Sequence, residues 1–320
     1  MKKYDVVSIG AAVQDVFLSG QVLNPKKEGD KWVEEFPLGA KLDLDDITFS
    51  TGGGATNASV TFARQGLQSA FMGKIGSDPA GAAVKMALTQ DSVDISHLSY
   101  SQDYSTGYSA LLLAPNGERT ILTYRGASTH YTPENFNIDD LQTKWIYMSS
   151  MSGNLDVLEH IVNIAHKKGI KIAINPGKGE LKQLDRFVKL LPKFDIISLN
   201  KEEWQMIVDT DDIGDILRTA ASYADYAVLT DGPNGSWATD SNKIVQAGMY
   251  EDVPVKDRTG AGDAFSSGFV AAILGGQSLE DAITFGSANS TSVVAHIGAK
   301  KGILTSDAEI HEMDLTVTDL

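Results

Sequence analysis

Residues 257–265 read Asp-Arg-Thr-Gly-Ala-Gly-Asp-Ala-Phe, follow a strand-like run at Val253–Val255 and open a segment of helical spacing that extends to Leu274. The first amides of a helix have no partner within the helix, and the helix dipole favours negative charge there. An anion can approach this backbone closely because three successive residues carry almost no side chain, namely Gly260, Ala261 and Gly262. The stretch therefore predicts a binding site for a phosphoryl group.

Asp263 lies one residue beyond these small residues. A carboxylate there can accept the proton of a hydroxyl that attacks the bound phosphorus, a role needed in in-line phosphoryl transfer. A structural interpretation also fits, because glycine before a helix often only makes a turn and Asp in a first helical turn is favourable with the dipole. Two common nucleotide patterns do not occur in the sequence: there is no GxxxxGK[ST], and GxGxxG fails at Phe265.

A second glycine-rich stretch, Gly-Gly-Gly-Ala-Thr-Asn at residues 52–57, stands before a helical segment. Three successive glycines are costly in conformational entropy unless a ligand or another backbone segment must come close. Asn57 can both donate and accept hydrogen bonds, and Asp15, just beyond the first expected strand, can accept two from neighbouring hydroxyls. These residues suit a polyhydroxylated ligand. They equally suit a plain turn with Asn57 as helix cap and Asp15 as a solvated loop acid.

Short β-rich runs alternate with longer segments of helical spacing over most of the chain. The expected buried strands are Val6–Ile9, Ser69–Met72, Trp145–Met148, Ile170–Ile174, Ile196–Leu199 and Ala227–Thr230. The expected helices are Ala55–Gln65, Ala80–Leu88, Leu155–Lys168, Leu181–Leu190 and Ile213–Tyr223. This alternation predicts an α/β fold with a mostly parallel central sheet and helices on both of its faces. Ligands of such sheets bind at the carboxyl ends of the strands.

Two regions interrupt the alternation and are expected to pair as a small second sheet. Phe17–Phe49 contains strand-like pieces such as Lys31–Glu35, and Thr106–Tyr124 has the pattern of a hairpin around a turn at Pro115–Gly117. Beside a ligand crevice, such a sheet would act as a lid that excludes water. The predicted division is an α/β domain of residues 1–15, 51–97 and 129–320 and a β lid of residues 16–50 and 98–128.

Composition narrows the class of protein. The chain has 320 residues, with 27 Lys and Arg against 42 Asp and Glu, and its formal charge of −15 argues against nucleic acid or an anionic membrane as main partner. The lack of cysteine excludes disulfides, thiolate metal sites and a cysteine nucleophile. Without a signal-peptide pattern or a long apolar run, we expect a soluble cytoplasmic protein whose acidic end, Glu309–Leu320, frays.

Taken together, the two glycine-rich motifs resemble those of the PfkB carbohydrate kinase family, which has the ribokinase-like fold. The N-terminal family motif, a Gly-Gly pair followed by Asn within a few residues, matches residues 52–57. The C-terminal motif, usually Asp-x-Thr-Gly-Ala-Gly-Asp, matches residues 257–263. The resemblance covers nearly the whole chain. It implies an ATP-dependent kinase that transfers the γ-phosphoryl group to a hydroxyl of a sugar or sugar-like acceptor, with Mg²⁺ on the triphosphate.

The resemblance also implies roles for individual residues at the acceptor end. Asp263 looks like the catalytic base, and residues 260–262 look like the anion hole for the transferring phosphoryl group. The matched sugar-binding positions are Asp15, Gly53, Gly54 and Asn57. Arg125 lies in a segment that resembles a Tyr-Arg pair near the substrate of ketodeoxygluconate kinases and fructokinases, although it also fits an ordinary arginine at the lid edge. Val13 and Gly54 stand where ribokinases proper carry Asn and Lys, which removes ribose contacts.

At the nucleotide end, residues 200–203, Asn-Lys-Glu-Glu, resemble the Asn-x-x-Glu motif that organises Mg²⁺, water and phosphate. Asn200 and Glu203 would then serve the nucleotide, Glu203 through a Mg²⁺-bound water, but the same spacing is also a helix capping box. Residues 230–235 resemble the loop that lies along ATP, which makes nucleotide-binding candidates of Thr230, Gly232 and Gly235. In the family the helix after the C-terminal motif flanks adenine, which makes a candidate of Asn289.

Three further expectations follow from the resemblance. Asp257 fits a position that binds a monovalent cation such as K⁺ in some members, with carbonyls near Val293, His296 and Gly298 as partners. Lid strands of the family often pair between subunits, so we expect a homodimer. The acceptor could instead be a nucleoside, with an aromatic slot drawn from Phe17, Trp32, Phe36 and Tyr108, or the protein could be a non-catalytic sugar-binding regulator.

Overall fold

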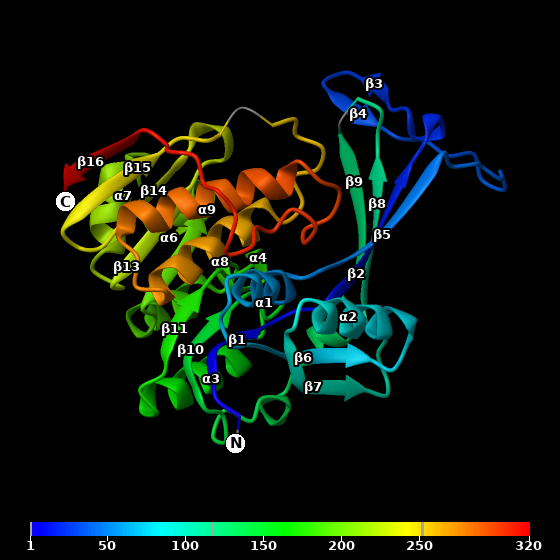
Figure 1. The fold of residues 1–320 in the computed structure, drawn as a ribbon. Helices are drawn as coiled ribbons and strands as arrows, with labels where there is room; N and C mark the ends of the chain where they lie inside the picture. Colours follow the sequence, from blue (N-terminus) through cyan, green and yellow to red (C-terminus); the bar gives the residue numbers. More distant parts are fainter. Residues whose placement is uncertain (1, 117, 251–252) are drawn as a thin grey trace.

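The computed structural model describes residues 2–116, 118–250 and 253–320. Within these residues the chain forms a ten-stranded sheet, a four-stranded sheet and a short hairpin (Figure 1). The strand order of the large sheet is β16-β15-β14-β13-β12-β11-β10-β1-β6-β7. Helices cover this sheet, so the expected α/β architecture with a smaller second sheet is confirmed.

Seven consecutive strands of the large sheet pair in parallel, and β13 is the last of them before the antiparallel strands begin. They are β1 (Tyr4–Ile9), β6 (Ser69–Gly76), β7 (Asp94–Ser101), β10 (Thr143–Met148), β11 (Lys171–Ile174), β12 (Ile196–Asn200) and β13 (Tyr226–Thr230). Neighbouring side chains of one strand lie on opposite faces of the sheet: Ile196 packs in the hydrophobic core on one face and Ile197 in the core on the other. Burial on both faces explains why these strands read as continuous apolar runs.

Helices from both ends of the chain share one face of the sheet: α1 (Gly54–Arg64), α8 (Ala261–Leu274) and α9 (Leu279–Val294). The opposite face is covered by α3 (Leu155–Lys167), α6 (Lys201–Ile207) and α7 (Ile213–Ala220). A further helix, α2 (Pro79–Gln90), packs near β6 and β7. Among the described residues, no helix combines the length and apolarity needed to cross a bilayer.

Three expectations about local structure were wrong. The helix expected at Leu181–Leu190 is broken into α4 (Lys178–Leu181), α5 (Leu184–Phe187) and a 3₁₀ turn, because Gln183 leaves the helical region between them. The acidic end does not fray throughout, since β16 (Leu315–Asp319) pairs with β15 (Lys243–Ala247), itself paired with β14 (Ser236–Thr239). Val253–Val255 is not a strand, and both valines line a pocket instead.

The small sheet rises from the body as a separate layer (Figure 1) and has the strand order β5-β2-β8-β9. Its strands are β2 (Val13–Ser19), β5 (Asp46–Gly52), β8 (Gly107–Leu113) and β9 (Arg119–Tyr124), and the hairpin of β3 (Lys26–Glu28) and β4 (Lys31–Val33) lies beyond them. The hairpin expected at Thr106–Tyr124 is the β8–β9 pair, and Gly117 of its turn lies outside the described residues.

The strand bounds shift the expected lid boundaries by a few residues. Residues 98–101 belong to β7 and pair with β6, so they are part of the large sheet rather than the lid. Residues 13–15 belong to β2, which is separated from the end of β1 by only three residues. Asp15 is therefore carried by a strand of the small sheet.

Candidate active site

The two glycine-rich motifs meet in space although they are about 200 residues apart. The Asn57 amide Nδ2 donates to Asp263 Oδ2 at 2.8 Å. Gly54 lies at the same point: a Cβ there would stand 2.9 Å from Asp263 Oδ1 and 2.2 Å from Ser149 Oγ. Only glycine leaves room for this approach, so the start of α1 and the start of α8 form the walls of one site.

The start of α8 is open to an anion. Gly260 is the N-cap residue with φ of 81°, and a Cβ there would lie 2.4 Å from Ala299 Cβ. Within the described residues no side chain caps this helix, and a Cβ on Gly262 would face open space. The Ala261 amide makes a long hydrogen bond of 3.4 Å to the Arg258 carbonyl, and the next two amides keep their hydrogen-bonding capacity and the dipole field for a ligand.

Asp257 fixes the loop that leads into this helix. Its carboxylate accepts hydrogen bonds from the Thr259 amide at 2.9 Å, the Thr259 hydroxyl at 2.7 Å and the Gly298 amide at 3.1 Å. Asp257 is buried, and the bond to Gly298 ties the loop before α8 to the loop after α9. The side chain therefore has a clear structural role here, and only its Oδ2, which accepts a single hydrogen bond, keeps a lone pair available to a cation.

Two carboxyl groups of the site are easier to protonate than usual. Burial raises the pKa of Asp263, against the opposing effects of the Asn57 hydrogen bond and the Lys300 charge. Burial also raises the pKa of Asp15 to about 6, again opposed by Lys300. A raised pKa makes Asp263 a stronger proton acceptor once it is ionised.

Lys300 is a residue of this site that the sequence did not reveal. Its ammonium Nζ donates to the Thr51 carbonyl at 2.7 Å, Thr56 Oγ1 at 2.8 Å and Asn57 Oδ1 at 2.7 Å. Burial lowers the pKa of Lys300 to about 7, although Asp15 and Asp263 act to raise it. Because Lys300 occupies the amide oxygen of Asn57, the NH₂ group of that amide is the one turned toward Asp263.

The other predicted acceptor residues have distinct local causes. Gly53 has φ of 97°, and a Cβ there would lie 2.3 Å from the Ala11 carbonyl, so close packing requires this glycine. Gly52, which the sequence did not single out, makes room for Asp15, whose Oδ2 would lie 2.1 Å from a Cβ at that position. Arg125 is exposed at the end of β9, where the chain returns from the small sheet to the body.

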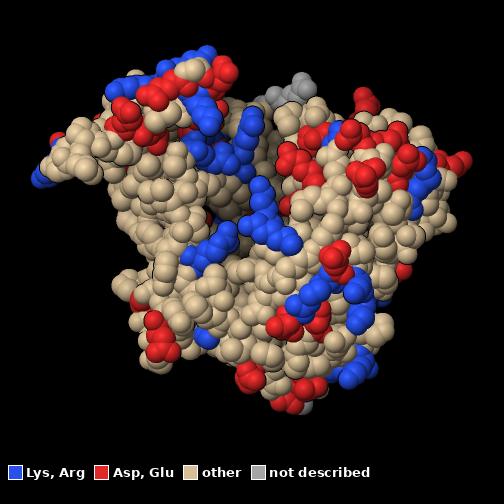
Figure 2. Space-filling model, turned by 180° about the vertical axis from the view of Figure 1, so that it is seen from behind, with Lys and Arg blue, Asp and Glu red and all other residues tan. Residues whose placement is uncertain are grey.

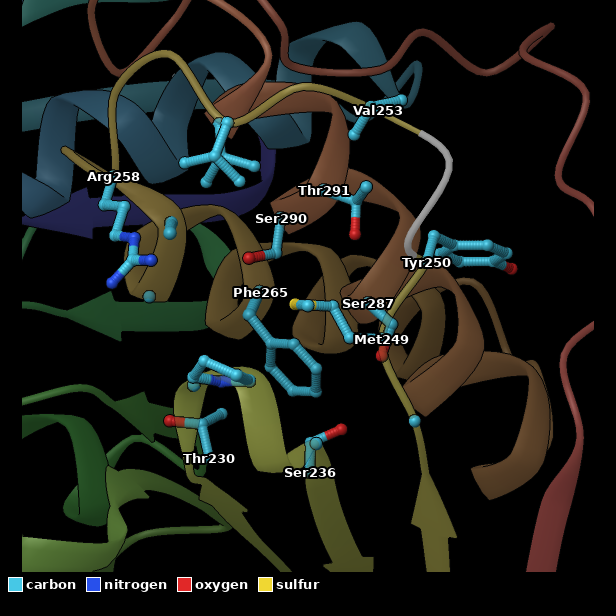
Figure 3. Close-up of a pocket in the computed structure, with 18 residues that line it drawn as sticks. Thr230, Ser236, Met249, Tyr250, Val253, Arg258, Phe265, Ser287, Ser290 and Thr291 are labelled. Atoms are coloured by element: carbon cyan, nitrogen blue, oxygen red, sulfur yellow. The ribbon is translucent and has the colours of Figure 1, made fainter. Parts of the chain in front are cut away.

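A pocket of about 370 Å³ adjoins the start of α8 (Figure 3). Its walls come from the loop after β13, from β14 and from helices α8 and α9. Three predicted nucleotide residues line it together with the α8 start: Thr230, Gly232 and Gly235. The pocket is mainly apolar, with the Phe265 ring near its centre and Arg258 at the edge in Figure 3.

The prediction for Asn289 was wrong as regards its side chain. The side chain is fully buried, donates to the Ala264 carbonyl at 2.8 Å and accepts from the Leu304 amide at 2.9 Å. It joins α9 to α8 and to the C-terminal loop. The pocket is lined instead by Ser287, Ser290, Thr291 and Val294, whose spacing places them along one face of α9.

Asn200 and Glu203 form the reciprocal capping box that their spacing allows. Asn200 Oδ1 accepts from the Glu203 amide at 2.9 Å, and Glu203 Oε2 accepts from the Asn200 amide at 3.0 Å. Burial raises the pKa of Glu203, and the charge of nearby Lys178 opposes this shift. Asn200 is the register partner of Thr230, so the box lies at the same strand ends as the pocket. The outer Glu203 lone pairs can accept from a metal-bound water.

The charge distribution also favours an anionic ligand. Figure 2 shows a hollow between the small sheet and the body with several Lys and Arg side chains gathered around it, while Asp and Glu side chains gather on the body next to it and at the tip of the small sheet. Among the described residues, no three His, Asp or Glu side chains come together to hold a metal ion.

Comparison with known proteins places this geometry in a family. The model of the pfkB family of carbohydrate kinases matches residues 28–306. Ribokinase of Haemophilus influenzae is 28% identical over 83% of this chain and 88% of that protein, and 5-dehydro-2-deoxygluconokinase of Bacillus licheniformis is 24% identical over 98% and 96%. The nucleoside kinase structure of Methanocaldococcus jannaschii superimposes with a TM-score of 0.77 at 21% identity, covering 96% and 97% of the chains. The chain belongs to the PfkB family of carbohydrate kinases, and it is a phosphotransferase of the ribokinase-like fold.

Proposed function

We propose that this protein transfers the γ-phosphoryl group of ATP to a hydroxyl of a sugar or sugar-like acceptor, with the small sheet closing as a lid. The hydrogen bond between Asn57 and Asp263 is the observation that supports the proposal. It joins an amide expected to bind the sugar to a carboxylate beside a helix start that no side chain caps. An acceptor hydroxyl beside this pair, within reach of the Asp263 carboxylate, would face phosphorus held by the first amides of α8.

The chemistry follows from these positions. Asp263 accepts the proton of the acceptor hydroxyl as its oxygen forms a bond to the γ-phosphorus, and the bond from phosphorus to the β,γ-bridging oxygen breaks to release ADP. The first amides of α8 stabilise charge on the phosphoryl oxygens. Mg²⁺, when bound, would neutralise triphosphate charge, with Glu203 accepting from its water. Asp257 and carbonyls near residues 293–298 are the proposed oxygen ligands for K⁺.

The first test is Asp263→Asn, which keeps size and hydrogen bonding but removes the proton acceptor. We expect turnover to fall by at least about three orders of magnitude with little change in melting temperature. Asp281→Asn is the matched control, because Asp281 is the third residue of α9 as Asp263 is of α8, and its carboxylate accepts only at the exposed Ser278 end. Near-normal turnover of Asp263→Asn would refute the assigned base.

The acceptor is to be found by screening sugars, sugar acids and nucleosides with ATP, following ADP release. Two of the aromatic residues expected for a nucleoside slot lie on opposite faces of the small sheet. Phe17 shares the lid face of Asp15, whereas Tyr108 is the register partner of Gln14 and so lies on the opposite face. We therefore favour a sugar over a nucleoside. Flat ADP release with every acceptor would support the non-catalytic alternative.

A homodimer through the lid is part of this proposal. The lid face opposite Asp15 exposes apolar side chains that the strand register places together, namely Ile47, Phe49, Tyr108, Leu122 and Tyr124. A contiguous apolar face of this kind marks an interface. Light scattering should report a dimer for the wild type and a monomer for Phe49→Lys with Leu122→Lys. A wild-type monomer at all concentrations would refute the dimer.

A further inference from the structure

Lys178 lies at the carboxyl ends of the parallel strands and has no partner of opposite charge. It is exposed and is the first residue of α4, four residues after β11 ends. Within the described part of the chain, no acidic side chain forms an ion pair with it. Ligands of a parallel sheet bind at this edge, so an unpaired ammonium here is available to an anion. A solvated surface lysine would also be unpaired, and the neighbours of Lys178 decide between the two.

The pairing of β11 with β12 carries Lys178 toward the capping box of Asn200 and Glu203. Beyond the paired residues, the Asn175 amide Nδ2 donates to the Ser198 carbonyl at 2.9 Å, so the chain after β11 still runs beside β12. Lys178 follows Asn175 by three residues, and Asn200 follows Ser198 by two. The charge of Lys178 also reaches Glu203, where it opposes the burial that raises the pKa of that carboxyl. Lys178 thus stands next to the residue proposed to accept from a Mg²⁺-bound water.

On its other side, the turn that carries Lys178 adjoins the loop that borders the Asp263 site. A Cβ on Gly177 would lie 2.5 Å from Ser150 Oγ, so the turn touches the loop after β10. Ser149 of the same loop bounds the acceptor site at the start of α1. Because β11 lies between β12 and β10 in the sheet, Lys178 stands between the metal-water position and the proposed base. A phosphoryl group passes between these two positions during its transfer.

A buried carboxylate that the proposed mechanism does not use fixes this turn. Glu180 is 1% exposed, and its Oε2 accepts from the Gly177 amide at 2.8 Å and from Ser150 Oγ at 3.2 Å. Its Oε1 accepts from the Met151 amide at 2.8 Å and from the Gly153 amide at 2.7 Å. Burying a charge is costly unless it is hydrogen-bonded, and these four donors offset that cost. Glu180 therefore holds the turn before Lys178 against the loop after β10.

We propose that Lys178 is a further catalytic residue, which binds the γ-phosphoryl group during its transfer, and that Glu180 is a positioning residue that holds the turn carrying Lys178. The inference rests on the function proposed above. An ammonium is a point charge suited to phosphate, and its flexible stem can follow the group from nucleotide to acceptor. Its charge offsets the negative charge on the phosphoryl oxygens. The bonds formed and broken are those of the proposed reaction, and Lys178 neither gains nor loses a proton.

Calorimetry with ADP and with AMP-PNP, an ATP analogue that is not cleaved, separates contact with the third phosphate from binding of the rest of the nucleotide. Lys178→Met should weaken AMP-PNP binding about tenfold and change ADP binding less than about twofold, because only AMP-PNP carries a γ-phosphate. With ATP and the acceptor found by the screen, kcat should fall about a hundredfold, and Lys178→Arg, which keeps the charge, should recover part of it. Lys182→Met is the matched control, because Lys182 is exposed at the end of α4 and loses the same charge.

Glu180→Gln tests the positioning role. Glutamine leaves one oxygen for the four donors, so the melting temperature should fall and AMP-PNP affinity should decrease while ADP affinity stays within about twofold. If Glu180 acts through Lys178, adding Glu180→Gln to Lys178→Met should cause no further loss of AMP-PNP affinity. Equal losses for ADP and AMP-PNP, or fully additive losses in the double variant, would show that Glu180 serves only the fold.

Two results with an active wild type would overturn the role of Lys178 alone. One is Lys178→Met that matches Lys182→Met in both AMP-PNP affinity and kcat, which would make Lys178 a solvated surface charge. The other is a loss confined to the KM for the acceptor, which would show that Lys178 binds the acceptor and not the phosphoryl group. Wild-type protein that binds neither nucleotide and releases no ADP with any acceptor would refute the proposed function itself.

Discussion

Lys300→Met would test whether a buried ammonium organises the acceptor site. Methionine keeps the apolar stem of the side chain and removes all three hydrogen bonds, at 2.7, 2.8 and 2.7 Å. Loss of such a buried charged group leaves its acceptors unpaired, although the variant also avoids burying a charge. We expect the free energy of unfolding to fall by about 2–4 kcal/mol. For 320 residues, that corresponds to a melting temperature lower by about 3–6 °C.

The larger effect should be on the chemical step. Lys300 holds Asn57 Oδ1, so the NH₂ group of Asn57 faces Asp263. Without Lys300 the Asn57 amide can flip, which would place its oxygen against the Asp263 carboxylate and replace a hydrogen bond with repulsion. Loss of one hydrogen bond to a charged group corresponds to a decrease in kcat of about tenfold to a hundredfold. The KM for ATP should change less than twofold, because Lys300 does not line the pocket proposed for the nucleotide.

The assay is a thermal melt together with initial rates at saturating ATP and varied acceptor. Lys301→Met is the control, because Lys301 is the exposed neighbour and loses the same charge. If Lys300→Met matches Lys301→Met in both melting temperature and kcat, the ammonium does not position Asn57 and the reasoning fails.

Two further outcomes follow from the same site. Since burial raises the pKa of Asp15 to about 6, its carboxylate takes up a proton as the pH falls through that value and loses acceptor capacity for sugar hydroxyls. The KM for the phosphoryl acceptor should therefore rise below about pH 6. The Asp15→Asn variant should have a high KM that does not depend on pH in this range. Equal pH profiles of KM for wild type and variant would contradict the role of Asp15. Gly54→Ala would set a Cβ 2.2 Å from Ser149 Oγ, so kcat/KM for the acceptor should fall at least about tenfold. The double variant with Ser149→Ala should recover part of this activity. Full activity of the single variant would show that neighbouring groups move aside without cost.

The parallel half of the sheet could be predicted because its strands are buried on both faces and read as apolar runs. The edge strands β7 and β16 were missed because they are partly exposed and carry mixed residues and a weaker pattern. The inner strands β14 and β15 were missed because they are short, with four and five residues. Asn289 was misjudged because the sequence does not say which face of α9 meets the pocket. The lining residues 287, 290, 291 and 294 follow helical spacing, and residue 289 falls off that stripe.

Both glycine-rich motifs could be found because each has a local reason for small residues, and the structure brings them together. Lys300 could not be found in this way. Beside Lys301 it reads as part of an exposed basic pair, and its burial depends on partners about 240 residues earlier in the chain. Short-range patterns carry no information about such partners.

The route of the chain between the two sheets has a kinetic consequence. Only residues 10–12 separate β1 of the body from β2, the strand that bears Asp15, whereas Asp263 belongs to the body. Any rotation of the small sheet about this short connection moves Asp15 toward or away from Asp263. With the lid closure proposed above, binding of the acceptor and closure of the site coincide, so initial-rate patterns should show the two substrates adding in a compulsory order.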